Sequence, residues 1–213
     1  MTPHAYSELW PCDLSCFTPN PEFNVSASTS AFFRDYGWPR FFQTQYTRIN
    51  FRPRLTLLGD ECANSKIAVS PKFSRWLILA DVEHDIGDAQ AYICLDGNEK
   101  VQYFSVVPEE DDGLAQLVAL SVWDMGNCML AILEWNRSTS GSLKTGEAVM
   151  KFLRLINRTF FSLDTKEATC PLCQSAAHNS ANTFWFWNII GFMYDPACNG
   201  SESFPEEIDI AFG

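Results

Sequence analysis

Four residues in the last quarter of the chain have side chains that could hold a zinc ion: Cys170, Cys173, His178 and Cys198. A Cys-x-x-Cys pair presents two thiolates to one tetrahedral ion, and a third thiolate with one imidazole would complete the ligand set. The second pair of ligands lacks the standard spacing. We therefore predict no metal and no cofactor, and a zinc site stays the open alternative.

Patterns that carry catalysis are not matched. His84 stands between Glu83 and Asp85, which could suggest acid–base chemistry, but a charged turn after a strand is the commoner origin of such a triplet. A zinc deaminase needs His-x-Glu and Pro-Cys-x-x-Cys, whereas Pro171 falls inside the cysteine pair. The serine hydrolase, P-loop and dinucleotide motifs do not occur. We predict that the protein is not an enzyme.

Two features could instead bind a partner protein. Four carboxylates follow one another after Pro108, and they could steer a basic partner or form a solvated turn. A tryptophan between Gly37 and Pro39 could be an exposed aromatic anchor or a core residue. The predicted partner-binding residues are Glu109, Glu110, Asp111, Asp112 and Trp38.

Composition narrows the class of partner. The chain has 213 residues, 46% of them hydrophobic, and 15 basic residues against 26 acidic ones give a net charge of −11. This length supports a proper hydrophobic core, and the composition excludes global disorder. A net negative charge repels nucleic-acid phosphates and favours association with a basic protein. We therefore expect a protein partner and no nucleic acid.

The elements that must position these residues alternate in type along the chain. An apolar helical stretch ends at Gly37, and Ser121 begins a later helix with apolar residues at spacings of three and four. Strand-like runs lie between them, at 41–51, 75–82, 89–96 and 100–107, with a tight hairpin turn at Gly97-Asn98. Two more helices are expected at 144–161 and around 184–194. This order predicts an α+β fold with an antiparallel sheet of about five or six strands covered by helices on one side.

Three parts of the chain are expected: an irregular N-terminal lead-in over residues 1–30, one α+β domain over 31–195, and an acidic C-terminal tail over 196–213. No signal peptide is visible, and the longest uncharged apolar run, 184–194, is too short to span a membrane. We therefore expect a cytoplasmic protein that does not bind a membrane. Its eight cysteines are then most simply small core residues.

These patterns resemble, in order, the SUKH superfamily, which includes a yeast cell-wall synthesis regulator and many bacterial toxin-immunity proteins. Residues 31–39, ending F-F-R-D-Y-G-W-P, resemble the family's helix and its Gly-Leu-Pro type turn. A-Y-I-C-L-D at 91–96 resembles a strand ending in Asp. Residues 117–133 resemble a strand-to-helix junction, and Phe186-Trp187 a late aromatic helix. The chain departs from the family pattern at Trp38 and at Ala119.

The resemblance implies a non-enzymatic α+β domain that binds another protein. In bacteria such a partner is commonly a polymorphic toxin, so the expected function is that of an immunity protein that neutralises a basic toxin domain by covering its active site. A SUKH-like regulator or scaffold without a toxin partner is the alternative. The fold alone does not choose between them.

Overall fold

The computed structural model describes residues 2–43, 47–84, 91–106, 114–137 and 211–212. Its helical segments are α1 (Pro3–Ser7), the 3₁₀ turn η1 (Pro21–Phe23), α2 (Ala27–Ala31), the π-helical turn η2 (Phe32–Tyr36), α3 (Leu58–Asn64) and α4 (Val122–Arg137). Its strands are β1 (Phe41–Gln43), β2 (Thr47–Leu57), β3 (Leu77–His84), β4 (Ala91–Leu95), β5 (Val101–Ser105), β6 (Leu114–Ala119) and β7 (Ala211–Phe212).

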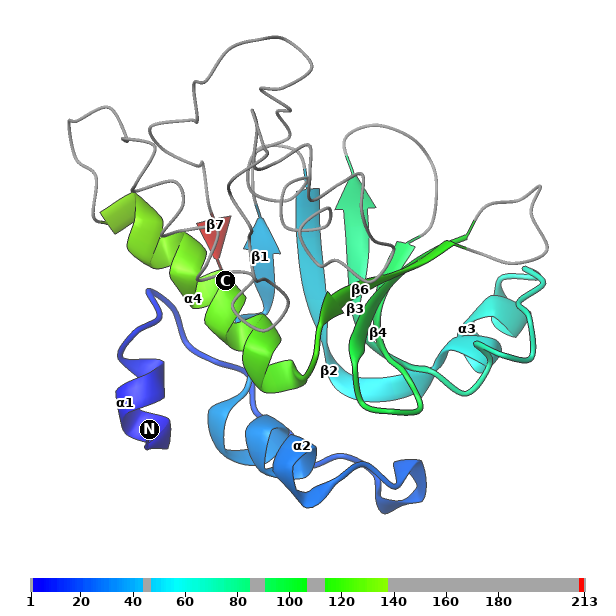
Figure 1. The fold of residues 1–213 in the computed structure, drawn as a ribbon, viewed down its shortest axis with the longest axis horizontal. Coiled ribbons are helices and arrows are strands. Elements are labelled where there is room, and N and C mark those ends of the chain that lie inside the picture. Colours follow the sequence, from blue (N-terminus) through cyan, green and yellow to red (C-terminus); the bar gives the residue numbers. More distant parts are fainter. Residues whose placement is uncertain (1, 44–46, 85–90, 107–113, 138–210, 213) are drawn as a thin grey trace, which may run out of the picture.

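All seven described strands form one antiparallel sheet in the order β6-β5-β4-β3-β2-β1-β7 (Figure 1). Six of them follow the chain as a simple meander, and the two-residue β7 is added beside β1. The predicted α+β class and antiparallel sheet are confirmed. The run expected at 41–51 is divided, because residues 41–43 and 47–57 form two paired strands.

The side chains of the sheet alternate between two cores. On β4, Ala91, Ile93 and Leu95 face a core shared with α4 and the N-terminal helices. Tyr92 and Cys94 point to the other face, where they join residues of α3 in a second, smaller core. Figure 1 shows α3 well away from α1, α2 and α4. Helices therefore pack on both faces, because the short α3, which the sequence patterns missed, covers part of the face expected to be open.

The predicted hairpin between β4 and β5 is confirmed, with Leu95 opposite Val101. Asp96 organises its turn, because its carboxylate accepts hydrogen bonds from the backbone N–H groups of Asn98 and Lys100. The residue that takes the left-handed conformation is Glu99, at φ 58°. A glycine is the usual choice at such a position in a hairpin.

The helix stop at Gly37 is confirmed, although α2 begins at Ala27 with Ser26 as its N-cap, earlier than expected. Gly37 has φ 71° and donates its N–H to the carbonyl of Phe32 at 2.8 Å. A Cβ at this position would lie 2.3 Å from the carbonyl oxygen of Ser15. Only a glycine at position 37 leaves room for the N-terminal segment around Ser15 to pass against this turn.

The predicted start of α4 is also confirmed. The Ser121 hydroxyl accepts a hydrogen bond from the N–H of Asp124 at 3.1 Å, as an N-cap does. Met125 and Met129 are buried on the apolar stripe. Gly126, which interrupts that stripe, lies where a Cβ would be 2.7 Å from the hydroxyl of Tyr6, so α1 packs closely on α4 at this point.

The N-terminal segment is more ordered than expected. It contains α1, and both Tyr6 and Trp10 are buried in the larger core. Leu9, between them in the sequence, is exposed. The helices predicted at 144–161 and around 184–194 lie outside the described residues.

Candidate functional site

Trp38 is a core residue, so its prediction as an exposed partner-binding anchor is wrong. Its side chain is 2% exposed and stacks on the ring of Phe51, with 4.9 Å between centroids. It also meets the ring of Phe32 edge-on at 4.6 Å. Trp38 points inward because its backbone pairs with Ser15, which places the N-terminal segment beside it.

The other predicted site residues lie outside the described part of the chain. This holds for the acidic run Glu109, Glu110, Asp111 and Asp112, and for the candidate zinc ligands Cys170, Cys173, His178 and Cys198. His84 was expected in a turn, but it ends β3, opposite Thr47 of β2. Within the described ranges, no group of three or more His, Cys, Asp or Glu residues could hold a metal ion.

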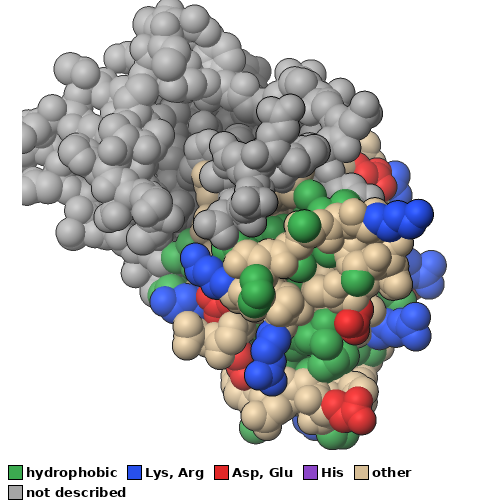
Figure 2. All heavy atoms as spheres, turned by 90° about the vertical axis from the view of Figure 1, so that its right-hand side faces the viewer, with side chains coloured by type: hydrophobic (Ala, Val, Ile, Leu, Met, Phe, Trp, Pro, Cys, Tyr) green, Lys and Arg blue, Asp and Glu red, His purple; other side chains and the backbone are tan. Residues whose placement is uncertain are grey.

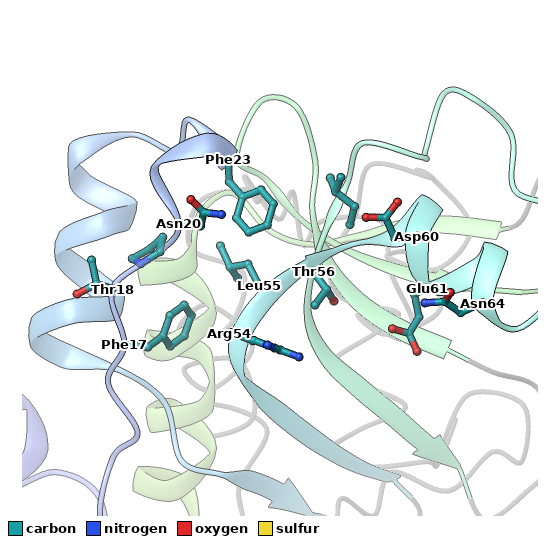
Figure 3. Close-up of a pocket in the computed structure, with 12 residues that line it drawn as sticks. Phe17, Thr18, Asn20, Phe23, Arg54, Leu55, Thr56, Asp60, Glu61 and Asn64 are labelled. Carbon is teal, nitrogen blue, oxygen red and sulfur yellow. The ribbon is translucent and has the colours of Figure 1, made fainter.

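The structure places a groove of about 500 Å³ between the N-terminal segment and the junction of β2 with α3 (Figure 3). This volume lies within the range of ligand-binding clefts. One wall comes from the segment 17–23 and the other from residues 54–64, so the groove joins parts of the chain that lie more than 30 residues apart. Its lining residues are Phe17, Thr18, Pro19, Asn20, Phe23, Arg54, Leu55, Thr56, Leu57, Asp60, Glu61 and Asn64.

An irregularity in β2 forms the second wall. β2 pairs with β3 up to Phe51, opposite Ala80, and again from Thr56, opposite Ile78. Four residues of β2 therefore stand opposite a single residue of β3, and such a bulge bends a strand away from its partner. β1 pairs with β2 only over 48–50. Residues 52–55 thus leave the regular sheet and face the segment 17–23.

A half-buried cation holds this wall in place. The guanidinium of Arg52 donates two hydrogen bonds to the carboxylate of Asp81, from Nε at 2.9 Å and from Nη2 at 2.5 Å. Its Nη1 donates to Oγ1 of Thr56 at 2.8 Å and to Oε2 of Glu61 at 3.0 Å. Both Thr56 and Glu61 line the groove. Arg52 therefore fastens β3, β2 and α3 to one another directly behind the groove.

The charge state of this cation is secure. Burial by itself would lower the pKa of Arg52, but the hydrogen bonds and charges of Asp81 and Glu61 outweigh this effect and raise that pKa. The guanidinium side chain is only 17% exposed. A half-buried cation paired with two carboxylates in this way maintains geometry, because loss of any member leaves a charge without its partner.

Two charged groups of the groove remain available to a ligand. Asp60 and Arg54 are both exposed, and neither forms an ion pair within the described part of the chain. Phe17 and Phe23 are half-buried against the larger core. Figure 3 shows the ring of Phe23 and the side chain of Asp60 on opposite sides of the hollow. Among the described residues, the groove thus combines apolar walls with one carboxylate and one guanidinium that form no ion pair.

The described cysteines are poor candidates for thiol chemistry. Burial raises the pKa of Cys62, and burial together with the neighbouring Cys62 raises the pKa of Cys94 well above the usual range. Burial, with the nearby carboxylates of Asp13 and Asp35, also raises the pKa values of Cys12 and Cys16. Because the thiolate is the reactive form, these thiols are held in their unreactive state at neutral pH.

The sequence patterns did not find the groove. Its one local signal is Arg52-Pro53-Arg54, a proline between two arginines inside a strand-like run, because proline interrupts the pairing of a strand.

No described helix combines the length and apolar character that crossing a membrane requires. In comparisons with known proteins, no family model, no curated protein and no solved structure matches the chain. The resemblance to the SUKH superfamily therefore rests on the sequence patterns alone.

Proposed function

We propose that the protein is a non-enzymatic binding module for another protein, and that it acts as an immunity protein by covering the active site of a basic toxin domain. The observation that carries the binding role is the lining of the groove. Half-buried Phe17 and Phe23 line the groove together with the exposed charged residues Asp60 and Arg54. An apolar centre with a polar rim is the usual anatomy of a protein interface.

The arrangement of polar groups supports binding rather than chemistry. Arg52, Asp81 and Glu61 are committed to one another by short hydrogen bonds. The thiols of Cys62 and Cys94 are held protonated by burial. A catalytic nucleophile instead needs a lowered pKa or an adjacent base. The immunity role itself comes from the SUKH resemblance and from the net charge of −11, which favours a basic partner.

The test is purification of the tagged full chain from its native cells, followed by mass spectrometry of the proteins that co-purify. The proposal expects one stoichiometric basic protein. That protein, purified separately, should bind the chain with an affinity that falls between 50 and 200 mM salt, and its toxic activity should be blocked at a one-to-one ratio. A stoichiometric partner without toxic activity would replace the immunity role with a regulatory or scaffold role. Failure to recover any partner that binds again in purified form would contradict the binding module itself.

A further inference from the structure

The backbone beside the groove is poorly suited to receiving an added strand. The N–H of Phe51 still donates to the carbonyl of Arg40, but beyond Phe51 the edge of β2 is not paired with β1. An incoming strand would need backbone N–H donors along this edge, but Pro53 has none. Prolines at strand edges are a common means of preventing strand addition. A partner in this groove is therefore held mainly through its side chains.

The charge that α3 presents to the groove is negative. Asp60 and Asn64 stand four residues apart, on the same face of α3. Both line the groove, and Figure 3 shows both side chains at its α3 end. The neighbouring Glu61 is already bonded to Arg52, whereas Asp60 has no ion-pair partner within the described residues. Among the described residues, no cation neutralises this carboxylate.

The apolar walls match a long side chain with a charged end. Phe17, Phe23 and Leu57 are half-buried and contribute apolar surface to the groove that Asp60 also lines. Lysine and arginine have apolar stems that pack on such surfaces while their charged ends reach a polar group. Aromatic rings also attract cations placed over their faces. An acidic side chain would have a shorter stem and would meet the like charge of Asp60.

We propose that the groove is the docking site for a cationic side chain, an arginine or a lysine, on the surface of the partner protein. This inference rests on the proposed function, since it names the chemistry by which the module recognises its basic partner. Asp60 supplies the opposite charge, and the rings of Phe17 and Phe23 pack against the stem. Arg54 has the same sign as the occupant, so it weakens binding.

The groove chemistry is tested with the isotope-labelled full chain and a short peptide of serine, glycine and arginine with blocked ends. A matched peptide in which citrulline replaces arginine keeps the shape and removes the charge. NMR shifts are expected at Phe23, Leu57 and Asp60 with the arginine peptide only. Asp60→Asn should weaken that binding about two- to fivefold, as the loss of an exposed ion pair does. Arg54→Gln should strengthen it about twofold.

Glu8→Gln is the matched control, because Glu8 is an exposed carboxylate on the surface outside the groove. This variant should leave the affinity unchanged. Equal binding of the citrulline peptide, or equal effects of Asp60→Asn and Glu8→Gln, would overturn the inference. An increase in affinity from Arg54→Gln is a result that a merely structural role for these side chains does not predict.

The purified partner separates this inference from the proposed function. Opposite changes in its dissociation constant from Asp60→Asn and Arg54→Gln would support both. A partner that binds with the same constant to both variants would overturn the docking site and leave the binding module standing. Recovery of no partner, with the arginine peptide still bound through Asp60, would contradict the proposed function while the cation site stands.

Discussion

The carboxylate of Glu99 fastens the β4–β5 hairpin to the start of α2, and replacing it should loosen the fold in a pH-dependent way. Its Oε1 accepts a hydrogen bond from the backbone N–H of Ser26 at 2.5 Å. Its Oε2 accepts from the hydroxyl groups of Ser26 at 2.6 Å and Thr29 at 2.5 Å. Three donors from one helix start thus converge on a side chain 70 residues away in sequence.

The size of the effect follows from which donors can be rehydrated. Ser26 is exposed, so water replaces the lost carboxylate there at little cost. Thr29 is only 4% exposed, and its hydroxyl would be left without that acceptor. Loss of one shielded hydrogen bond to a charged group costs about 1.5–3 kcal/mol. Glu99→Ala should therefore lower the free energy of unfolding by about 2 kcal/mol, or Tm by about 4–8 °C for a chain of this size.

The left-handed backbone of Glu99 provides a control. At φ 58° a glycine would relieve a backbone cost of about 1–2 kcal/mol, so Glu99→Gly should be less destabilising than Glu99→Ala although both lose the carboxylate. Glu99→Gln keeps the size and one acceptor oxygen, and it should fall between the wild type and Glu99→Ala. Calorimetric and urea unfolding of the four proteins measures this order.

The pH dependence has a definite sign. Partial burial alone would raise the pKa of Glu99, but the hydrogen bonds from Ser26 and Thr29 outweigh this and lower that pKa. A carboxylate with a lowered folded-state pKa stabilises the fold above its unfolded pKa of about 4.3 and loses that contribution as pH falls through the folded value. The difference between wild type and Glu99→Gln should thus be full at pH 7 and shrink below pH 4. Equal free energies of unfolding of the two proteins at pH 7, or a difference that grows on acidification, would refute the stabilising role of the Glu99 carboxylate.

Three further substitutions test the packing. Gly126→Ala gains about 1 kcal/mol of helix propensity but places a Cβ 2.7 Å from the Tyr6 hydroxyl, so we expect net destabilisation. Adding Tyr6→Phe in the same chain should relieve it, and a double-mutant cycle in urea measures this coupling. Gly37→Ala should cost about 3 kcal/mol, because of its positive φ and a Cβ 2.3 Å from Ser15; unchanged thermal unfolding would contradict that contact. Arg52→Met should cost about 1–3 kcal/mol in urea unfolding and weaken groove binding, since Glu61 loses its anchor; a variant as stable as wild type would show that the cation is dispensable.

The elements that sequence patterns located are those fixed by local rules. The β4–β5 hairpin follows from two strand-like runs on either side of Gly97-Asn98, and α4 follows from the cap residue Ser121 and a stripe of apolar residues. The stop at Gly37 is equally local, because only glycine takes that φ readily. None of these predictions depends on residues distant in the sequence.

The features that escaped prediction depend on contacts between distant segments. α3 is seven residues long, and its buried residues, Leu58 and Cys62, belong to a core cluster that also contains Phe73, which is distant in the sequence. So short a helix carries too little periodic signal to be recognised. The position of Trp38 next to a sharp turn was compatible with an exposed or a buried side chain. In the fold its ring stacks on Phe51, a residue distant in the sequence, and lies in the core. The groove has the same origin, because Phe17 and Asp60 line one hollow only in the folded chain.

The distribution of charge separates two roles in the proposed binding. The undescribed segments hold more than half of the 26 acidic residues and only a third of the 15 basic ones. The described fold is therefore close to neutral. On the described part of the face that carries α3, lysine and arginine side chains lie among the acidic ones (Figure 2). The acidic side chains therefore form no continuous surface there. In the proposed complex, long-range attraction of a basic partner would then come chiefly from segments such as the acidic run, and the groove would make the short-range contacts.

Association and dissociation rates should accordingly respond to different substitutions. Neutralising Glu109, Glu110, Asp111 and Asp112 together, as Gln and Asn, removes charge that steers the encounter, so the association rate with the purified partner should fall several-fold at low salt and little at high salt. Asp60→Asn acts on a contact made only in the complex, and it should mainly raise the dissociation rate. Stopped-flow or surface-based kinetics at two salt concentrations resolves the two. An acidic-run variant with an unchanged association rate would show that these four carboxylates form a solvated turn and that the steering charge lies elsewhere in the chain.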